Sequence, residues 1–308
     1  MNNKNNYLAY ISLAVVCVVW GTTYLAIRIG VTDFPAFLFS ALRQIAAGIL
    51  LAGFMLTVGK VKWPGKQNII NQAVGGLFMI SFGNGLVGYA EVHVSSGLAA
   101  IICSMMPIWV IFINLIFSDD ERPTWPIIIG LAVGLSGIVM IFGEHLVEFS
   151  NTQYTIGILL TFVANISWAA GSVWMKKKNQ NSNAFLNAGL QMLFGGLFLL
   201  PLSLVFDDYT AIHWTTGTVY SLLYLIVIGS VLAYACYSYA IKKLPMTIVS
   251  LYAYINPLVA IFLGWIILDE RFNMRIAIAM IITIAGIYIV NKGYQLRSIS
   301  KAQLSAGK

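Results

Sequence analysis

Apolar residues in this chain fall in runs of about 20, separated by short polar segments that often contain Pro, Asn, Asp or Gly. An α-helix needs about 20 apolar residues to cross the hydrocarbon core of a bilayer, whereas a membrane β-barrel would show shorter segments of alternating polarity. The pattern therefore predicts an all-α polytopic membrane protein with ten transmembrane helices. The predicted spans are roughly residues 8–29, 35–57, 69–89, 96–117, 124–143, 155–175, 184–206, 216–240, 246–268 and 273–292.

Composition agrees with this interpretation. Of the 308 residues, 59% are hydrophobic and only 9% are charged, against about 25% charged in a soluble domain. The net charge of +7 comes from basic residues in short loops, which indicates membrane topology rather than binding to nucleic acid. The three cysteines lie inside apolar runs without a CxxC pair, so neither disulfides nor a metal site is expected. No cofactor is predicted.

The distribution of Lys and Arg predicts the orientation. If the N-terminus is cytoplasmic, 14 of the 18 basic residues fall on the cytoplasmic side, as the positive-inside rule requires. Both termini are therefore expected inside, and the location is the cytoplasmic (inner) membrane. The polar segment 293–308 is expected to be a frayed cytosolic tail.

Matching residues recur along the chain at spacings of 148 to 150: Trp20 recurs as Trp168, and Pro107 as Pro257. Both prolines lie within apolar runs and predict helix kinks. The two predicted repeats occupy residues 8–145 and 155–292. With five helices in each, the second repeat would be inverted relative to the membrane. Inverted repeats are typical of transporters; the alternative is that duplication only builds a bundle.

Several motifs resemble the EamA-type repeat of the drug/metabolite transporter superfamily. They are Trp20-Gly21-Thr22 with Arg28, Pro35, Arg43 and Ala46-Ala47, the stretch from Ala90 to Pro107, and Glu121 and Glu270 at the ends of helices four and nine. The second half departs from the pattern, with Gln191 at the Arg43 position. The resemblance implies ten helices in two inverted five-helix repeats, a central cavity built from both, and transport of small metabolites, often amino acids.

Polar and aromatic residues inside the apolar runs are the candidates for a substrate site. An amide in hydrocarbon needs a partner, which is either another helix or a substrate. Aromatic walls suit flat or amphipathic solutes and can hold cations, although aromatic residues are also common in helix packing. The cavity candidates are Trp20, Tyr24, Arg43, Asn84, Tyr89, Trp109, Asn165, Trp168, Tyr234, Tyr237, Tyr252 and Asn256.

Three ionisable residues have two interpretations each. Arg43 lies inside the second predicted helix, where its guanidinium could bind a substrate carboxylate or hydrogen-bond to structural partners. Glu91, near the end of the third predicted helix, is either a proton-coupling carboxylate or a solvated helix-end acid. Arg28 is a candidate gate or snorkelling residue, and Lys176 occupies its repeat-related position near the opposite face.

Enzymatic motifs are absent from the sequence. It contains no HExxH motif and no Walker-type GK[ST] loop, so we expect no enzymatic activity and no nucleotide hydrolysis. The prediction is a secondary transporter of small organic metabolites, in particular an exporter of amino acids or related compounds, working by alternating access. The alternatives are an exporter of amphipathic drugs or organic cations, favoured by a carboxylate in the cavity, and a membrane scaffold or receptor without transport, favoured by solid apolar packing.

Overall fold

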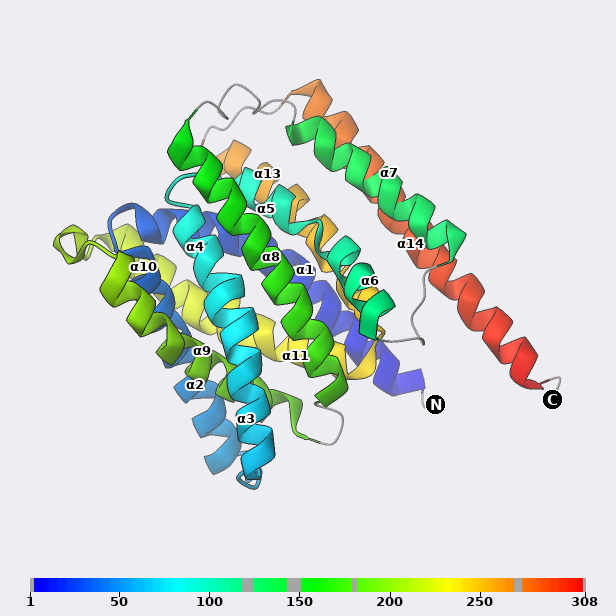
Figure 1. The fold of residues 1–308 in the computed structure, drawn as a ribbon, viewed down its shortest axis with the longest axis horizontal. Coiled ribbons are helices and arrows are strands. Elements are labelled where there is room, and N and C mark those ends of the chain that lie inside the picture. The colour runs from blue at the N-terminus through cyan, green and yellow to red at the C-terminus, as the bar shows by residue number, and fades with distance from the viewer. Residues whose placement is uncertain (1–2, 118–123, 143–150, 179–181, 269–272, 307–308) are drawn as a thin grey trace.

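The computed structural model describes residues 3–117, 124–142, 151–178, 182–268 and 273–306 (Figure 1). Within these ranges every regular element is helical. In chain order the elements are α1 (Asn3–Thr32), α2 (Ala36–Thr57), α3 (Lys66–Gly75), η1 (Gly76–Gly85), α4 (Leu86–Ala90), α5 (Ser96–Cys103), α6 (Met106–Phe117), α7 (Trp125–Phe142), α8 (Thr152–Lys178), α9 (Ala184–Phe206), η3 (Tyr209–Ala211), α10 (Thr216–Tyr224), η4 (Leu225–Leu232), α11 (Ala233–Lys243), α12 (Met246–Val249), α13 (Tyr252–Leu268) and α14 (Met274–Ala306).

Six helical segments in the described ranges are long and apolar enough to cross a membrane. They are Tyr7–Thr32, Ala36–Thr57, Lys66–Ala90, Thr152–Lys178, Ala184–Phe206 and Thr216–Lys243. Shorter apolar helices cover Trp125–Gly137, Tyr252–Ile267 and Ala277–Val290. The all-α, multi-pass membrane fold is therefore present, and the count of ten spans stays a prediction.

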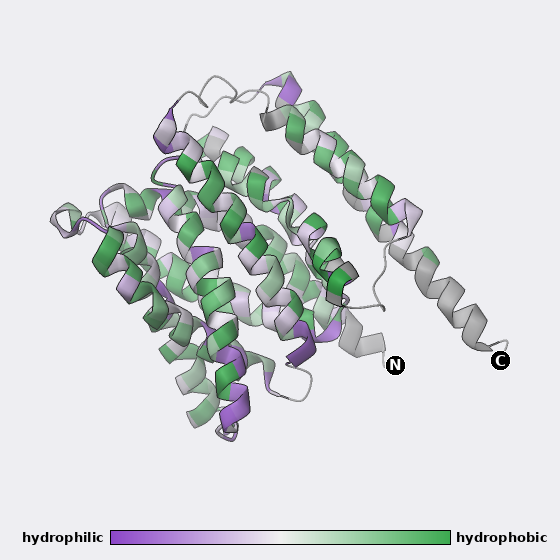
Figure 2. Ribbon diagram, in the orientation of Figure 1, coloured by the Kyte–Doolittle hydropathy of each residue, from purple (hydrophilic) through white to green (hydrophobic). Residues whose placement is uncertain are grey.

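Polarity is arranged for lipid rather than for water. Large apolar side chains are exposed on the outside, including Trp125 at 77% and Ile116 at 75%. Polar side chains such as Gln72, Asn165 and Gln191 are buried. Hydrophilic residues gather at helix ends, most visibly at the free end of α3 and the C-terminal end of α8 (Figure 2). This distribution matches helices whose sides face hydrocarbon and whose ends face the aqueous interface.

Two helix pairs pack along their lengths, α2 with α9 and α7 with α14. Figure 1 shows α7 and α14 side by side at one edge of the bundle. Glycine allows the close approach in both pairs, because a Cβ on Gly48 would lie 2.5 Å from the backbone N of Leu193, and one on Gly286 would lie 2.4 Å from that of Gly134. Small residues at helix contacts are the usual means of close packing in membranes.

Two π-helical segments of the described residues lie in the middle of long helical segments, Lys66–Ala90 and Thr216–Lys243. The segment η1 joins α3 to α4, and η4 joins α10 to α11. In a π turn the hydrogen bonds run from residue i to i+5, and such turns occur frequently at functional sites. Each segment carries glycine and a polar residue, Gly83 and Asn84 in η1 and Gly229 and Ser230 in η4.

The helix ends differ from the predictions at two places. The first-half span is interrupted between Cys103 and Met106, just before Pro107, as expected. In the second half the interruption is at Ser250 and Leu251, whereas Pro257 lies inside α13. The tail expected to fray is helical, since α14 continues to Ala306; its Gln, Leu, Arg, Lys and Ala residues are good helix formers.

Carboxylate and amide side chains cap two of the long helices. The Asp207 carboxylate, at the end of α9, accepts hydrogen bonds from the backbone N–H groups of Phe37 (3.2 Å) and Leu38 (2.7 Å) at the start of α2. The Asn183 side chain caps α9 itself, accepting from Phe185 and Leu186 at 3.0 Å. These contacts satisfy backbone donors that a helix N-terminus leaves unpaired.

Candidate functional site

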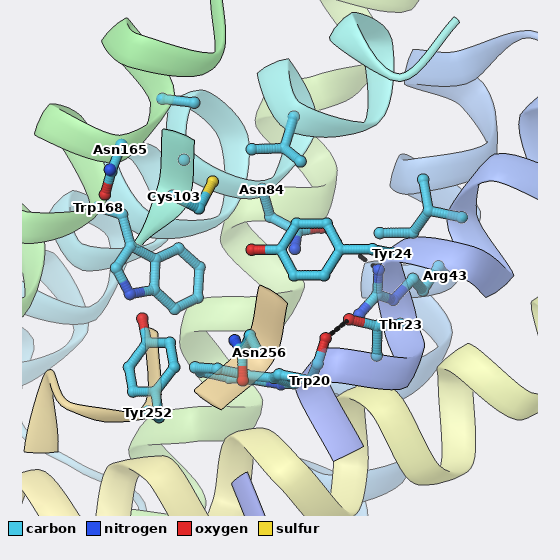
Figure 3. A pocket seen from close by; sticks show the side chains of 14 residues that line it. Trp20, Thr23, Tyr24, Arg43, Asn84, Cys103, Asn165, Trp168, Tyr252 and Asn256 are labelled. Atoms are coloured by element: carbon cyan, nitrogen blue, oxygen red, sulfur yellow. Dashed lines mark hydrogen bonds between the residues drawn. The ribbon is translucent and has the colours of Figure 1, made fainter. Parts of the chain in front are cut away.

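A small cavity lies in the centre of the bundle, between side chains of the first and second halves of the chain (Figure 3). Its walls come from α1, α2, η1, α4, α5, α8 and α13. The lining residues are Trp20, Thr23, Tyr24, Ile27, Arg43, Gly83, Asn84, Val87, Cys103, Ala164, Asn165, Trp168, Tyr252 and Asn256.

Aromatic rings form one side of the cavity. The indoles of Trp20 and Trp168 meet edge to face, with centroids 5.3 Å apart. Tyr252 meets Trp20 in the same way at 4.9 Å. The indole N–H of Trp20 donates to the Gly229 carbonyl oxygen at 3.1 Å, and that of Trp168 donates to the Tyr237 hydroxyl at 3.2 Å. Each indole is therefore held in one orientation by its hydrogen bond.

Arg43 is the charged residue of the cavity wall within the described residues. Its side chain is buried, with an exposed fraction of 3%. Its Nε donates to the Ser230 hydroxyl at 2.8 Å, and its Nη1 points to the Asn84 amide oxygen at 3.5 Å. These partners are neutral and use two of its three nitrogens, so no acid among the described residues balances the positive charge through a hydrogen bond.

At the repeat-related positions of Arg43 and Asn84, the second half of the chain makes a hydrogen bond between two uncharged side chains. Gln191 stands 148 positions after Arg43, and Tyr234 stands 150 positions after Asn84. The Tyr234 hydroxyl donates to the Gln191 amide oxygen, and the Gln191 amide nitrogen donates to the Gln72 side chain. The same pair of positions thus makes a charged contact in the first half and an uncharged one in the second.

Two further amides are held at the cavity wall. Asn165 donates to the Ile102 carbonyl oxygen at 2.7 Å. With its amide oriented for donation, Asn256 reaches the carbonyl oxygens of Cys17 and Tyr252, both at 3.0 Å. These hydrogen bonds use the N–H groups of the two amides.

The cavity has a volume of about 70 Å³. A water molecule takes about 30 Å³ of liquid, and pockets that bind small ligands usually measure about 300–1,000 Å³. The cavity therefore holds a few waters at most in this conformation. A metabolite would require the surrounding helices to move apart.

Near each end of the bundle a basic side chain binds carbonyl oxygens of a neighbouring segment. Arg28, near the end of α1, donates to the carbonyl oxygens of Glu91 and Val94 just beyond α4. Lys176, near the end of α8, donates to those of Ile241 and Leu244 at the end of α11. We call these the Arg28 clamp and the Lys176 clamp.

The two clamps lie at opposite ends of the molecule. Gly157 of α8 packs against Ala90, His93 and Val94 beside the Arg28 clamp. Lys176 lies 19 residues further along the same helix, which is about 28 Å at 1.5 Å per residue. Arg28 and Lys176 are 148 positions apart, and their acceptors are 150 apart, so the clamps are related by the predicted repeat.

Comparison with known proteins supplies the family. The EamA-like transporter family matches residues 7–143 and again residues 155–292. The chain belongs to this family. An uncharacterized inner membrane transporter, YedA of Escherichia coli K12, is 32% identical over 288 residues, covering 92% of this chain and 91% of that protein. The uncharacterized transporter YoaV of Bacillus subtilis is 25% identical, covering 92% and 97%.

A solved structure supports the fold alone. A protein crystal structure with 17% sequence identity superposes with a TM-score of 0.72, covering 94% of this chain and 98% of that one. Together with the apolar helices, these comparisons identify this EamA-family chain as a membrane transporter. A lipid bilayer and a small-molecule substrate follow from that class.

Eight of the twelve predicted cavity residues of this EamA protein line the central cavity. They are Trp20, Tyr24, Arg43, Asn84, Asn165, Trp168, Tyr252 and Asn256. Tyr234 lines a smaller neighbouring void together with Arg43, and Tyr237 packs behind Trp20 at a centroid distance of 4.7 Å.

The other two candidates lie away from the cavity. Tyr89 stacks on Phe37 with centroids 4.7 Å apart, and Trp109 packs against the central hydrophobic core. Sequence reasoning missed Thr23 and Cys103, which line the cavity. Thr23 adjoins Tyr24, but nothing in the pattern distinguishes Cys103 from a packing residue.

The interpretation of Glu91 as a solvated helix-end acid is wrong. Its exposed fraction is 0%, and its chain neighbours Ala90, His93 and Val94 pack against Gly157 of α8. Arg28, expected to be a snorkelling or gate residue, donates to backbone carbonyl oxygens across a helix contact. That contact fits the gate interpretation.

Proposed function

We propose that this transporter exports small carboxylate-bearing metabolites, in particular amino acids and related compounds, across the cytoplasmic membrane by alternating access. The observation that carries the proposal is Arg43, which is buried in a cavity wall that both halves build and, among the described residues, is hydrogen-bonded only to neutral partners. A guanidinium binds a carboxylate with two parallel hydrogen bonds, and burial strengthens that contact.

The alternatives are less well supported by the same cavity. Within the described residues no carboxylate lines it, which disfavours organic cations as the main substrates. Its lining of four aromatic rings, three amides and one guanidinium also differs from the solid apolar packing expected of a scaffold.

The clamps support the alternating-access part of the proposal. In an inverted repeat, exchange of conformation between the halves turns one open state into the other. Here both clamps are closed and the cavity is small, as an occluded intermediate requires. Opening one clamp at a time would connect the cavity to one side of the membrane.

The test is transport by the purified full-length chain in liposomes. Vesicles loaded with one unlabelled L-amino acid are diluted into the same labelled compound, and the assay is repeated with the decarboxylated amine. We expect counterflow of at least one amino acid and none of its amine. Arg43→Gln should abolish the preference for the carboxylate, and Trp168→Ala should reduce flux.

The matched control is Trp174→Ala, because Trp174 is 44% exposed on the same helix as Trp168 and faces away from the cavity. This variant should transport normally. The proposal fails if no compound moves faster than in empty vesicles, or if an amine moves as well as its amino acid.

A further inference from the structure

Glu91 carries a buried carboxyl group that the transport site does not use. Its exposed fraction is 0%, and neither carboxylate oxygen has a hydrogen-bond partner among the described residues. Arg28, a candidate for an ion pair with this carboxylate, donates to the backbone carbonyl oxygen of Glu91 instead. An ionised carboxylate buried without hydrogen bonds is very costly, and such a group takes up a proton instead.

The neighbours of Glu91 connect it to the cavity. The titratable and charged groups that interact electrostatically with it are Arg28 and Tyr24 from α1, Arg43 from α2 and Cys103 from α5. His93 lies two residues further along the chain, and Tyr154 of α8 belongs to the hydrophobic cluster that contains Ala90, the residue before Glu91. Arg43, Tyr24 and Cys103 also line the cavity. The charge of Glu91 therefore acts on the same guanidinium that the substrate carboxylate would bind.

We propose that Glu91 is a proton-binding site linked to the substrate site, so that one proton is carried together with each carboxylate substrate. The inference rests on the proposed function for its substrate. Because the proton moves in the same direction as the substrate, export runs against an inward proton gradient and requires a larger outward gradient of the substrate. Ionised Glu91 would offset the charge of Arg43 and repel a second carboxylate, whereas neutral Glu91 leaves Arg43 free to bind one. Substrate and proton therefore favour each other, and by linkage the effect is reciprocal.

The proton balance is simple. The Glu91 carboxylate takes a proton from water on one side, becomes a neutral carboxyl group, and returns the proton to water on the other side. The Arg28 clamp holds the carbonyl of Glu91 itself, so opening this clamp is the step that exposes the carboxyl group to that end. The other end is reached through the cavity when the Lys176 clamp opens.

The second half of the chain has no counterpart of this site. The position 150 residues after Glu91 is Ile241, which is buried beside the Lys176 clamp. Both repeats thus provide a clamp, but only the first provides a carboxyl group. One proton per transport cycle follows from this difference.

The first experiment measures the proton without any substrate. Infrared spectra of the full-length protein in nanodiscs should show a protonated carboxyl C=O band at pH 7 that Glu91→Gln removes. Asp208→Asn is the control, because Asp208 is exposed and two hydrogen bonds from Thr210 hold its carboxyl pKa below the ordinary value. This variant should keep the band. Absence of a Glu91-dependent band overturns the proposal.

The second experiment measures the linkage, with each L-amino acid that shows counterflow. Wild-type affinity should fall by up to about tenfold per pH unit above the titration of Glu91. An inward proton gradient should accelerate uptake, with acidification reported by an internal pH dye. Glu91→Gln should bind with no pH dependence and ignore the gradient, and Glu91→Asp should restore pH dependence.

The failures of the two proposals are distinguishable. If wild-type protein moves amino acids but ignores the gradient, the proton proposal is overturned and the proposed function stands. The same holds if Glu91→Gln remains driven by the gradient. If no compound moves, the proposed function fails, and with it the substrate linkage, while the infrared band still decides whether Glu91 holds a proton.

Discussion

Removing one clamp should open one end of the transporter. Lys176→Ala deletes the ammonium group that donates to the carbonyl oxygens of Ile241 and Leu244. A hydrogen bond to a charged group contributes about 1.5 kcal/mol at the lower end of its range, so two contribute about 3 kcal/mol to the closed end. Since 1.4 kcal/mol is tenfold, the ratio of open to closed should rise by about 100-fold at that end. Arg28→Ala should do the same at the other end.

The chain contains its own reporter for this change. Cys103 lines the cavity, and the other two cysteines, Cys17 and Cys236, can be replaced by Ala. A membrane-impermeant thiol reagent is applied to sealed vesicles of either orientation, and the labelling rate of Cys103 is measured. Lys176→Ala should accelerate labelling from the predicted cytoplasmic side only, and Arg28→Ala from the opposite side only.

Lys178→Ala provides the control for lost charge. Lys178 lies near Lys176 but contacts the Trp174 ring, with its Nζ 4.9 Å from the centroid. This substitution should leave the labelling of Cys103 unchanged from both sides. Equal acceleration from both sides in either clamp variant would refute the reasoning, because general loosening would explain it. An unchanged labelling rate of Cys103 in both clamp variants would also refute the reasoning, because it would mean that the clamps do not limit access to the cavity.

Three further predictions concern packing, capping and the cavity. Gly48→Val places side-chain atoms against the backbone of Leu193 and should destabilise the protein by about 1–3 kcal/mol, measured by thermal unfolding in detergent. The control is Gly53→Ala on the same helix, where a Cβ meets nothing within 4 Å. This substitution should be neutral or slightly stabilising. Asp207→Ala removes the cap of α2 and should lower the free energy of unfolding by about 1–2 kcal/mol, whereas an unchanged melting temperature would contradict the assignment. Trp168→Phe removes the hydrogen bond to Tyr237 but keeps an aromatic ring, so it should retain more amino-acid counterflow than Trp168→Ala.

The sequence predicted the helical membrane fold because length and polarity alone decide which segments can cross a bilayer. It also pointed to the cavity through the recurrence of Trp20 as Trp168, which meet at the centre of the bundle. A repeat within the sequence identifies residues at equivalent positions of the two halves, and this requires no knowledge of which residues are in contact. The inverted orientation of the repeats stays a prediction.

Contacts between distant segments could not be predicted in this way. The turn that carries Glu91 packs against α8, and no local pattern encodes that contact. Tyr89 and Trp109 are aromatic like the cavity residues, but Tyr89 stacks on Phe37 and Trp109 packs against the hydrophobic core. The break at Ser250 precedes a proline by several residues, so proline position alone does not locate a break.

The π-helical segments η1 and η4 offer a way for the two long helical segments that contain them to rearrange. A π turn holds one more residue than an α turn, and it can move along a helix by exchanging hydrogen-bond partners without unfolding it. Each residue that it passes changes its facing by about 100°. In η1 such a shift would rotate Asn84 away from Arg43, and in η4 it would rotate Ser230 away from it. Both hydrogen-bond partners that the described residues give the guanidinium thus lie on segments whose register can shift, so Arg43 could exchange its protein partners for a substrate. Amide hydrogen exchange that changes only in η1 and η4 on adding substrate would show this motion. Uniform protection in these two segments would exclude it.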